Sequence, residues 1–165
     1  MILIIGFGNS LRRDDGAGPA LANMVLAHES FEDIRIVEAH QLTPELAEEI
    51  AAPDVSAVIF MDSCVVQHTI GASCMAADVK LRRIDSRAAS PSFSHQCDPS
   101  SVMAYAELLC GRKSPAWIVS IPGVDFTHGE GFSDETMFFL PVASSKVCEL
   151  IRQLRKELLP DSFIL

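Results

Sequence analysis

Residues 1–28 have the sequence MILIIGFGNSLRRDDGAGPALANMVLAH, and this stretch decides the fold class. It opens with a short β-branched apolar run, Ile2 to Ile5, that ends at Gly6 as a buried strand does. A turn follows as far as Asp15, and apolar residues then recur at helical spacing to about His28. A buried strand that leads through a turn into a helix is the first unit of an α/β fold.

The same alternation of strand and helix continues along the chain. Strands are predicted at 34–37, 55–61, 75–81 and 117–121, and helices at 43–52, 98–111 and from 133 onward. We expect the strand from Val55 to stop at Asp62, Pro122 to close the last strand, and Pro141 to kink or interrupt the last helix. This order predicts a three-layer α/β/α sandwich with a mostly parallel twisted sheet.

Length and composition limit the remaining choices. The 165 residues suit one domain, 1–165, and 48% apolar residues are enough to build its core. A net charge of −9 disfavours nucleic acid and membrane surfaces as partners, and no apolar run approaches the roughly 18 residues that a membrane span needs. No secretory leader precedes the first strand, so we expect a cytoplasmic protein, and we expect a monomer.

The five cysteines are scattered and include no CxxC pair. Such a set fits neither a disulfide framework nor a structural zinc site. We expect reduced thiols that are mostly buried.

Acidic residues and one histidine follow the predicted strands. The pair Asp14-Asp15 comes after the first, Asp62 after the third and His95 after the fourth. Ligands bind outside the carboxyl ends of the strands in open α/β sheets, so these side chains are candidates to converge. Two carboxylates and an imidazole would form a site with open positions for a divalent metal.

Each of these residues also has an ordinary structural explanation. Asp14 is placed to cap the first helix, and adjacent residues at a helix start point in different directions, so only one of Asp14 and Asp15 is expected to face the crevice. Asp62 is in a position that suits a turn former, and His95 lies in a serine-rich loop that is ordinarily exposed. The convergence of the set is what packing alone explains poorly.

Other chemistries have weaker signals. The Gly6-x-Gly8 pair lacks the third glycine of a dinucleotide fingerprint, because Leu11 occupies that position. Ser10, or Cys97 with His95, would supply a nucleophile, but covalent catalysis needs a base within reach and a group that orients it. The sequence leaves these nucleophiles open.

The N-terminal run ILIIGFGNSLRRDDGAGPALA resembles the opening of the hydrogenase maturation endopeptidases, whose pattern is a strand, G-x-G-N, a spacer and D-[DE]-x-x-G. The similarity continues in order through HQLTPELAE from His40, VIFMDSC from Val58, SHQ from Ser94 and the GEGFS turn before the last helix. The resemblance therefore spans nearly the whole chain.

The resemblance implies a metal-dependent endopeptidase, a hydrolase that removes the C-terminal extension of a nickel-iron hydrogenase large-subunit precursor after nickel insertion. It implies that Asp15, Asp62 and His95 contact nickel and are the catalytic set. The nickel would arrive with the precursor, which is the expected partner, and no organic cofactor is implied. Imidazole and carboxylate both suit nickel. The HQLTPELAE stretch is most similar to members that serve cytosolic, NAD(P)-linked hydrogenases.

One departure from the family pattern lies after the last predicted strand. Many members have a glutamine or glutamate followed by proline in this loop, whereas here Gly123-Val124 leads into Asp125-Phe126. The substrate contacts of this loop are therefore expected to differ.

Two alternatives belong to other classes. A receiver-like phosphoacceptor domain would also carry an acid pair after the first strand and an aspartate after the third. Receivers need a lysine after a late strand, where this chain has Pro122-Gly123, and the spacer from Gly6 to Arg13 is too long for one. The other alternative is a non-catalytic module that binds the metal-loaded precursor.

Overall fold

The computed structural model describes residues 1–28, 32–66, 78–84 and 97–158. Its elements, in chain order, are β1 (Ile2–Phe7), the short 3-10 helix η1 (Arg13–Gly16), α1 (Ala17–His28), β2 (Ile34–Ala39), α2 (Leu46–Ile50), β3 (Ala57–Val65), β4 (Lys80–Ile84), α3 (Pro99–Cys110), β5 (Ala116–Gly123) and α4 (Asp134–Leu158).

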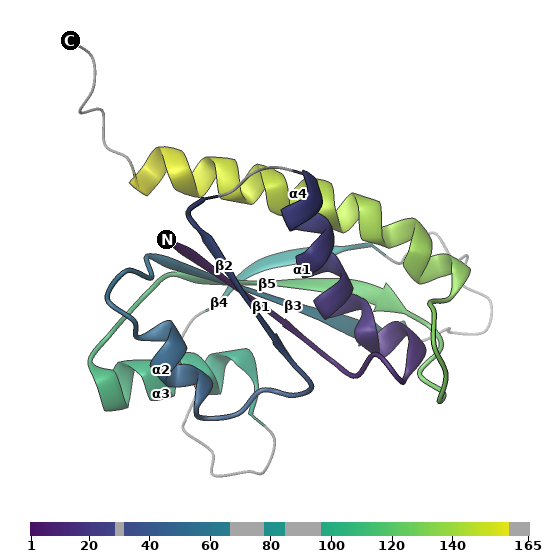
Figure 1. Cartoon of the computed structure of the whole chain (residues 1–165), viewed down its shortest axis with the longest axis horizontal. Coiled ribbons are helices and arrows are strands. Elements are labelled where there is room, and N and C mark those ends of the chain that lie inside the picture. Colours follow the sequence, from purple (N-terminus) through teal and green to yellow (C-terminus); the bar gives the residue numbers. More distant parts are fainter. Residues whose placement is uncertain (29–31, 67–77, 85–96, 159–165) are drawn as a thin grey trace.

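The strands form one sheet in the order β2-β1-β3-β5-β4. The β1–β2, β1–β3 and β3–β5 pairs are parallel, and only the edge strand β4 runs antiparallel to its neighbour β5. Helices α1 and α4 cover one face of the sheet, and α2 and α3 cover the other (Figure 1). The predicted three-layer sandwich with a mostly parallel sheet is confirmed.

Two predicted strand ends are wrong. β3 does not stop at Asp62 but continues to Val65, because Asp62 pairs with Ser120 and Cys64 with Pro122 of β5. Pro122 does not close β5, which runs to Gly123. β4 pairs with β5 only as far as Ser120, so the missing N–H of Pro122 faces no ladder on that side.

The helix boundaries largely follow the sequence. α3 begins after Asp98, whose carboxylate accepts a hydrogen bond from the Ser101 N–H at 2.7 Å, and ends at Gly111 in the left-handed conformation. The helix predicted from Thr43 begins only at Leu46, because residues 43–45 form a turn first. Pro141 lies inside α4 without interrupting it.

The predicted fourth strand is shifted. β4 begins at Lys80, so it shares only two residues with the expected span, of which residues 75–77 lie outside the described part of the chain. Its sequence, Lys-Leu-Arg-Arg-Ile, has little apolar alternation, which explains the error.

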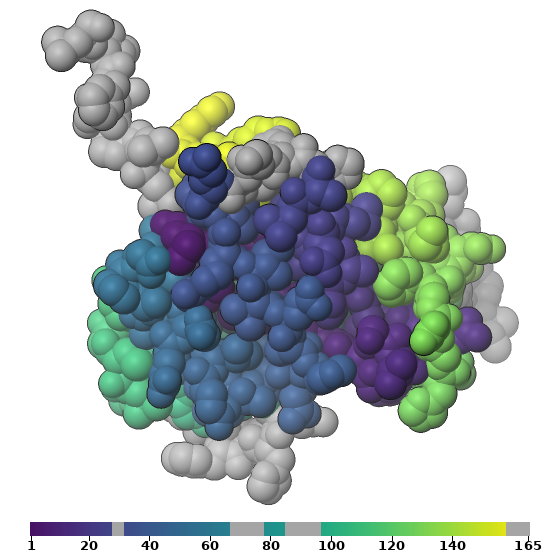
Figure 2. Space-filling view, viewed as in Figure 1, coloured from purple at the N-terminus to yellow at the C-terminus, as the bar shows by residue number. Residues whose placement is uncertain are grey.

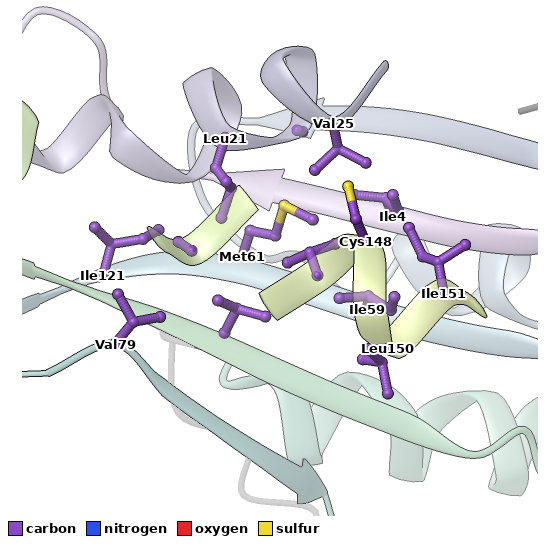
Figure 3. Packing of buried hydrophobic residues seen from close by; sticks show 14 of the residues in the cluster. Ile4, Leu21, Val25, Ile59, Met61, Val79, Ile121, Cys148, Leu150 and Ile151 are labelled. Carbon is purple, nitrogen blue, oxygen red and sulfur yellow. The ribbon is translucent and has the colours of Figure 1, made fainter. Parts of the chain in front are cut away.

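Two cores lie on opposite faces of the sheet. The α1/α4-side core contains Ile4, Ile59 and Met61, which pack against Leu21 and Ile151 as Figure 3 shows. Ile5, Phe60 and Ile118 lie in the α2/α3-side core; the neighbours that pack around them there are Leu3, Ile50, Val58, Val102 and Ala106. Because side chains alternate along a strand, this division assigns a face to every strand residue.

The expectation of mostly buried cysteines is wrong for the described residues. Cys148 is buried, Cys64 and Cys97 are half-buried, and Cys110 is exposed at the end of α3; all four are free thiols. Among the helices described, none is both long and apolar enough to cross a bilayer.

Candidate functional site

The candidate site lies where the sheet changes its winding direction. β1 is followed by α1 on one face of the sheet and β2 by α2 on the other (Figure 1). In open α/β sheets a ligand-binding crevice lies at such a switch point, outside the carboxyl ends of the strands, here those of β1 and β3. Asp15 lies in η1 directly after β1, and Asp62 lies near the end of β3. The structure therefore brings these two predicted residues to the same end of the sheet, where the carboxyl ends of its parallel strands lie.

Close backbone packing positions Asp15. The Asn9 N–H donates to Oδ2 of Asp15 at 3.1 Å, and the Asn9 side chain accepts a hydrogen bond from the Leu11 N–H. Gly8 has a φ of +135°, and a Cβ at this residue would lie 1.9 Å from the backbone oxygen of Asp15. Only glycine allows this approach. The G-x-G-N motif thus orients the Asp15 carboxylate.

Asp14 has a structural role that the sequence did not reveal. The prediction that it caps the first helix is wrong: its carboxylate accepts hydrogen bonds from the Val124, Asp125 and Ser133 N–H groups and from the Ser133 hydroxyl, at 2.7 to 2.9 Å. Burial raises the pKa of Asp14, but these hydrogen bonds outweigh it and leave that pKa below its ordinary value. Asp14 is buried, and its carboxylate already accepts four hydrogen bonds. Asp15 is therefore the member of the pair that is available to bind a ligand in the crevice.

The loop between β5 and α4 lies across η1 and is held there by further contacts. Arg13 donates through its backbone N–H to Gly129, and its guanidinium pairs with the Asp125 carboxylate at 3.4 Å. The Asp14 N–H donates to the Asp125 carbonyl. Figure 2 shows the purple N-terminal segment and the light-green loop side by side at one end of the molecule. The Asp125-Phe126 departure therefore falls in a loop whose Asp125 anchors η1.

Of the acidic residues at the site, Asp62 has the pKa that is shifted furthest from its ordinary value. The pKa of Asp62 is raised to about 7: desolvation is the largest cause, a hydrogen bond from the Ser63 backbone opposes it, and the charge of Asp15 adds a smaller raising effect. Because the charge of Asp15 acts on the poorly solvated Asp62, the two carboxylates repel each other when both are ionised, and a bound cation would relieve that repulsion. The donor set thus fits a divalent metal.

His95, the third predicted ligand, lies outside the described residues. Within the described ranges no group of three or more histidine, cysteine, aspartate or glutamate side chains is close enough to hold a metal. The two carboxylates are therefore the part of the predicted set that the structure brings together, and the role of His95 stays a prediction.

A cavity of about 300 Å³ opens at the carboxyl ends of β1 and β2. The residues that line it are Gly8, Ser10, Pro19, Glu38, Ala39 and His40. His40, one of these residues, begins the HQLTPELAE stretch. Ser10 and His40 share this cavity, but the hydrogen bonds of the described residues include none between them, so no Ser-His pair is assembled there.

The thiols near the site are not activated. Burial raises the pKa of Cys64, with a smaller lowering effect from Lys80 and a raising effect from Asp62. Burial and then the charges of Asp98 and Glu45 raise the pKa of Cys97. A nucleophilic thiol needs the opposite shift, so these contacts disfavour a cysteine mechanism.

The topology also distinguishes this chain from a receiver domain. Receivers have a wholly parallel sheet in the order 2-1-3-4-5. Here the last two positions are exchanged and β4 is antiparallel. Moreover, Asp14 is sequestered by four donors and cannot serve as one of a pair of metal ligands.

Sequence reasoning missed three contributors to this site. Asn9 orients Asp15, Ser133 holds Asp14, and Ser120 lies beside Asp62 on the neighbouring strand. Asn9 belongs to the G-x-G-N motif and so had a signal. Ser133 and Ser120 are distant in sequence, and only strand register and loop packing bring them here.

Comparison with solved structures identifies the fold as that of the hydrogenase maturation endopeptidases. HybD from E. coli superimposes with a TM-score of 0.70 at 17% identity, over 92% of both chains. The [NiFe] hydrogenase maturation protease HycI from Thermococcus kodakarensis gives a TM-score of 0.65 at 19% identity, again over 92% of both. HybD from Thermococcus kodakarensis gives 0.66 at 16% identity, over 90% of this chain and 97% of that one.

No family model matches the sequence, and no curated protein matches it. The resemblance predicted from the N-terminal motif is thus confirmed by structure, at the level of the fold.

Proposed function

We propose that this chain is a hydrogenase maturation protease that removes the C-terminal extension of a nickel-iron hydrogenase large-subunit precursor after nickel insertion. The observation that carries the proposal is the Asp15–Asp62 pair at the crevice of this fold, with Asp62 poised near neutral pH. The fold neighbours described as hydrogenase maturation proteases support the class of reaction. The nickel belongs to the substrate, and no organic cofactor is required.

In this proposal Asp15, Asp62 and His95 bind the nickel that the precursor carries. Asp62 gives up its proton to do so, and a bound divalent cation offsets the mutual repulsion of the two carboxylates. Fixing the metal fixes the polypeptide around it, and the cavity beside Gly8 receives the neighbouring segment of that chain. Holding the scissile peptide in one orientation supplies much of the rate enhancement. Precursor that lacks nickel is then not held and not cut.

Intact mass spectrometry tests the proposal. A candidate precursor, nickel-loaded or nickel-free, is incubated with the wild-type protein and with the Asp62→Asn and His95→Ala variants. Asp54→Asn is the matched control, because Asp54 is an exposed aspartate remote from the crevice. We expect loss of one C-terminal peptide from the loaded precursor only, abolished by the two site variants and retained by the control.

Two outcomes would contradict the proposal. Equal cleavage of loaded and nickel-free precursor would remove nickel from the recognition step. Stable binding of loaded precursor with no change in its mass would instead indicate a non-catalytic binding module.

The proposal places the protein in the cytoplasm as a monomer whose partner is the precursor. Sedimentation at several protein concentrations should give the mass of one chain, 17.9 kDa. A concentration-dependent dimer would contradict this part of the proposal.

A further inference from the structure

The edge strand β4 carries a cluster of positive charge on an acidic molecule. Its sequence contains Lys80, Arg82 and Arg83, whereas the whole chain has a net charge of −9. All three side chains are exposed. β4 is the last strand of the sheet order, and among the described strands it pairs only with β5. It thus combines an exposed basic surface with an edge position.

Strand register connects β4 to the acid pair. Lys80 of β4 pairs with Ser120 of β5, and Ser120 pairs with Asp62 of β3. Residues paired in register share one face of a sheet. Lys80, Ser120 and Asp62 therefore form a row across three neighbouring strands, on the side covered by α2 and α3.

The two faces of β4 differ in what they contact. Arg82 pairs with Ile118, a residue of the α2/α3-side core, so it shares the face of Lys80. Arg83 lies on the opposite face, where its guanidinium stacks 5.7 Å from the Trp117 ring. Neither Lys80 nor Arg82 forms an ion pair with any other described residue, whereas Lys146 is paired with Asp78. Within the described part of the chain, Lys80 and Arg82 are thus exposed cations on the Asp62 side that have no ionic partner.

Lysine and arginine on an edge strand also protect it from pairing with other chains. Edge protection requires charged side chains on β4, but it does not require that they lie on the same face of the sheet as Asp62, as Lys80 and Arg82 do. Residues two apart on a strand lie about 7 Å from each other, which matches alternate side chains of a second extended chain. Cations at this spacing suit an extended segment with carboxylates at alternate positions.

We propose that Lys80 and Arg82 bind an acidic, extended segment of the substrate polypeptide, on the β4 side of the acid pair. They would thereby act as specificity-determining residues for the proposed cleavage. This inference rests on the proposed function for the identity of the polypeptide. It does not rest on that function for the binding itself, which requires only an extended chain with carboxylates at the right spacing.

Peptide binding tests the inference without any cleavage step. The probes are two fluorescein-labelled peptides, one of alternating Glu and Thr and one of alternating Gln and Thr, followed by fluorescence anisotropy. We expect the wild type to bind the Glu peptide more tightly than the Gln peptide. The Lys80→Gln/Arg82→Gln double variant should bind the Glu peptide about tenfold more weakly, because it lacks two exposed charge contacts. Added salt should weaken wild-type binding, because exposed charges are screened.

Arg83→Gln is the matched control, since it removes one charge from the same strand on the opposite face. The inference is overturned if Arg83→Gln weakens binding as much as Lys80→Gln alone. It is also overturned if the double variant binds the Glu peptide normally and only self-associates, which would leave edge protection as the role of these residues.

Precursor cleavage separates this inference from the proposed function. With a precursor that is cut, the double variant should raise KM and leave kcat near the wild-type value. Normal KM in that variant would overturn the inference and leave the proposed function standing. If the Glu peptide binds through Lys80 and Arg82 but no precursor is cut, the inference stands and the proposed function is overturned.

Discussion

Two adjacent carboxylates in η1 have opposite environments. Asp14 is buried and accepts four hydrogen bonds, which favour its ionised form, whereas Asp15 accepts one backbone N–H and its charge acts on the half-buried Asp62. The Asp14 carboxylate is committed to holding two segments of chain together. The Asp15 carboxylate lies 4.0 Å from the Arg12 guanidinium, and with 25% of its side chain exposed it is the acid of the two that a cation can reach. This contrast separates the structural acid from the site acids.

Asp62 should make the stability of the protein fall as the pH rises. Its folded-state pKa, about 7, lies above the ordinary aspartate value, so between those two pH values the folded state holds a proton that the unfolded state has lost. Above pH 7 the full cost is present, with an upper limit of about 4 kcal/mol. We expect Asp62→Asn to be more stable than the wild type at pH 8 and equal to it near pH 4, by urea unfolding.

A divalent cation supplies the control for this prediction. Nickel should narrow the difference between the wild type and Asp62→Asn at pH 8, because the metal compensates the ionised carboxylate. If the difference in unfolding free energy between the wild type and Asp62→Asn is the same at every pH, the pKa of Asp62 is not raised in the folded state, and the prediction is wrong.

Asp14→Asn should destabilise the protein strongly. An amide places an N–H group against donors that now point at a carboxylate, and loss of buried charge-assisted hydrogen bonds costs about 3 kcal/mol. Because the pKa of Asp14 lies below its ordinary value, its contribution is complete above that ordinary value and is lost as the pH falls through the folded-state pKa. Urea unfolding at pH 7 measures the loss.

Asp125→Asn is the control, since Asp125 lies in the same loop and contacts Arg13 at the surface. It should cost clearly less than Asp14→Asn. Similar losses in the two variants would contradict the role assigned to Asp14.

At the level of elements, helix α1 lies unusually close to the carboxyl ends of β1 and β3. A Cβ on Gly18 would lie 2.3 Å from the Met61 carbonyl oxygen and 2.5 Å from that of Phe7, and both are backbone atoms. A Cβ on Gly6 would in turn lie 2.8 Å from the Gly18 carbonyl oxygen. The helix can approach the sheet only because these residues have no side chain. This approach sets the position of η1, and therefore of Asp15.

Gly18→Ala should therefore be destabilising in spite of the better helix propensity of alanine. Alanine at an open helical position gains up to about 1 kcal/mol, but forcing a methyl group against two carbonyls costs about 3 kcal/mol. Thermal unfolding measures the net loss. Gly111→Ala is the control: no atom lies within 4 Å of its Cβ, so it should lose only about 1 kcal/mol, from its positive φ. A Gly18→Ala variant at wild-type stability would show that α1 can shift freely.

At the level of the whole molecule, the central strand β3 joins the two cores. Ile59 faces the α1/α4 side and Phe60 the α2/α3 side, and neither side chain is exposed to solvent. Each core therefore needs the same strand in place. A lesion in one core should be felt in the other, as expected of a single domain over residues 1–165.

Phe60→Ala tests this coupling. Removing a buried phenylalanine costs about 3–5 kcal/mol. The one tryptophan, Trp117, packs against the α1/α4-side core, on the face opposite Phe60. We expect its fluorescence and the far-ultraviolet circular dichroism of the variant to show the same shifted unfolding midpoint. A fluorescence transition that keeps the wild-type midpoint would mean that the two layers unfold separately.

Local pattern was enough for much of this protein. The apolar run before Gly6, the helical spacing after it and the capped start and glycine end of α3 depend on residues near in sequence, and the structure confirms them. The regular alternation of strand and helix predicted the layered fold. The position of Asp15 after the first predicted strand was enough to place it at the carboxyl end of the sheet, because ligand sites of open α/β sheets lie there.

The remaining features depend on contacts between distant segments. Only the tertiary structure decided that the Asp14 carboxylate accepts hydrogen bonds from residues 110 to 119 positions away, because hydrogen bonds to a distant loop leave no local sequence pattern. Only strand register decided that Asp62 lies inside β3 and shares a row with Ser120 and Lys80. Likewise, the pKa of Asp62 depends on burial and on the charge of Asp15, which are set by how the chain packs and not by its order.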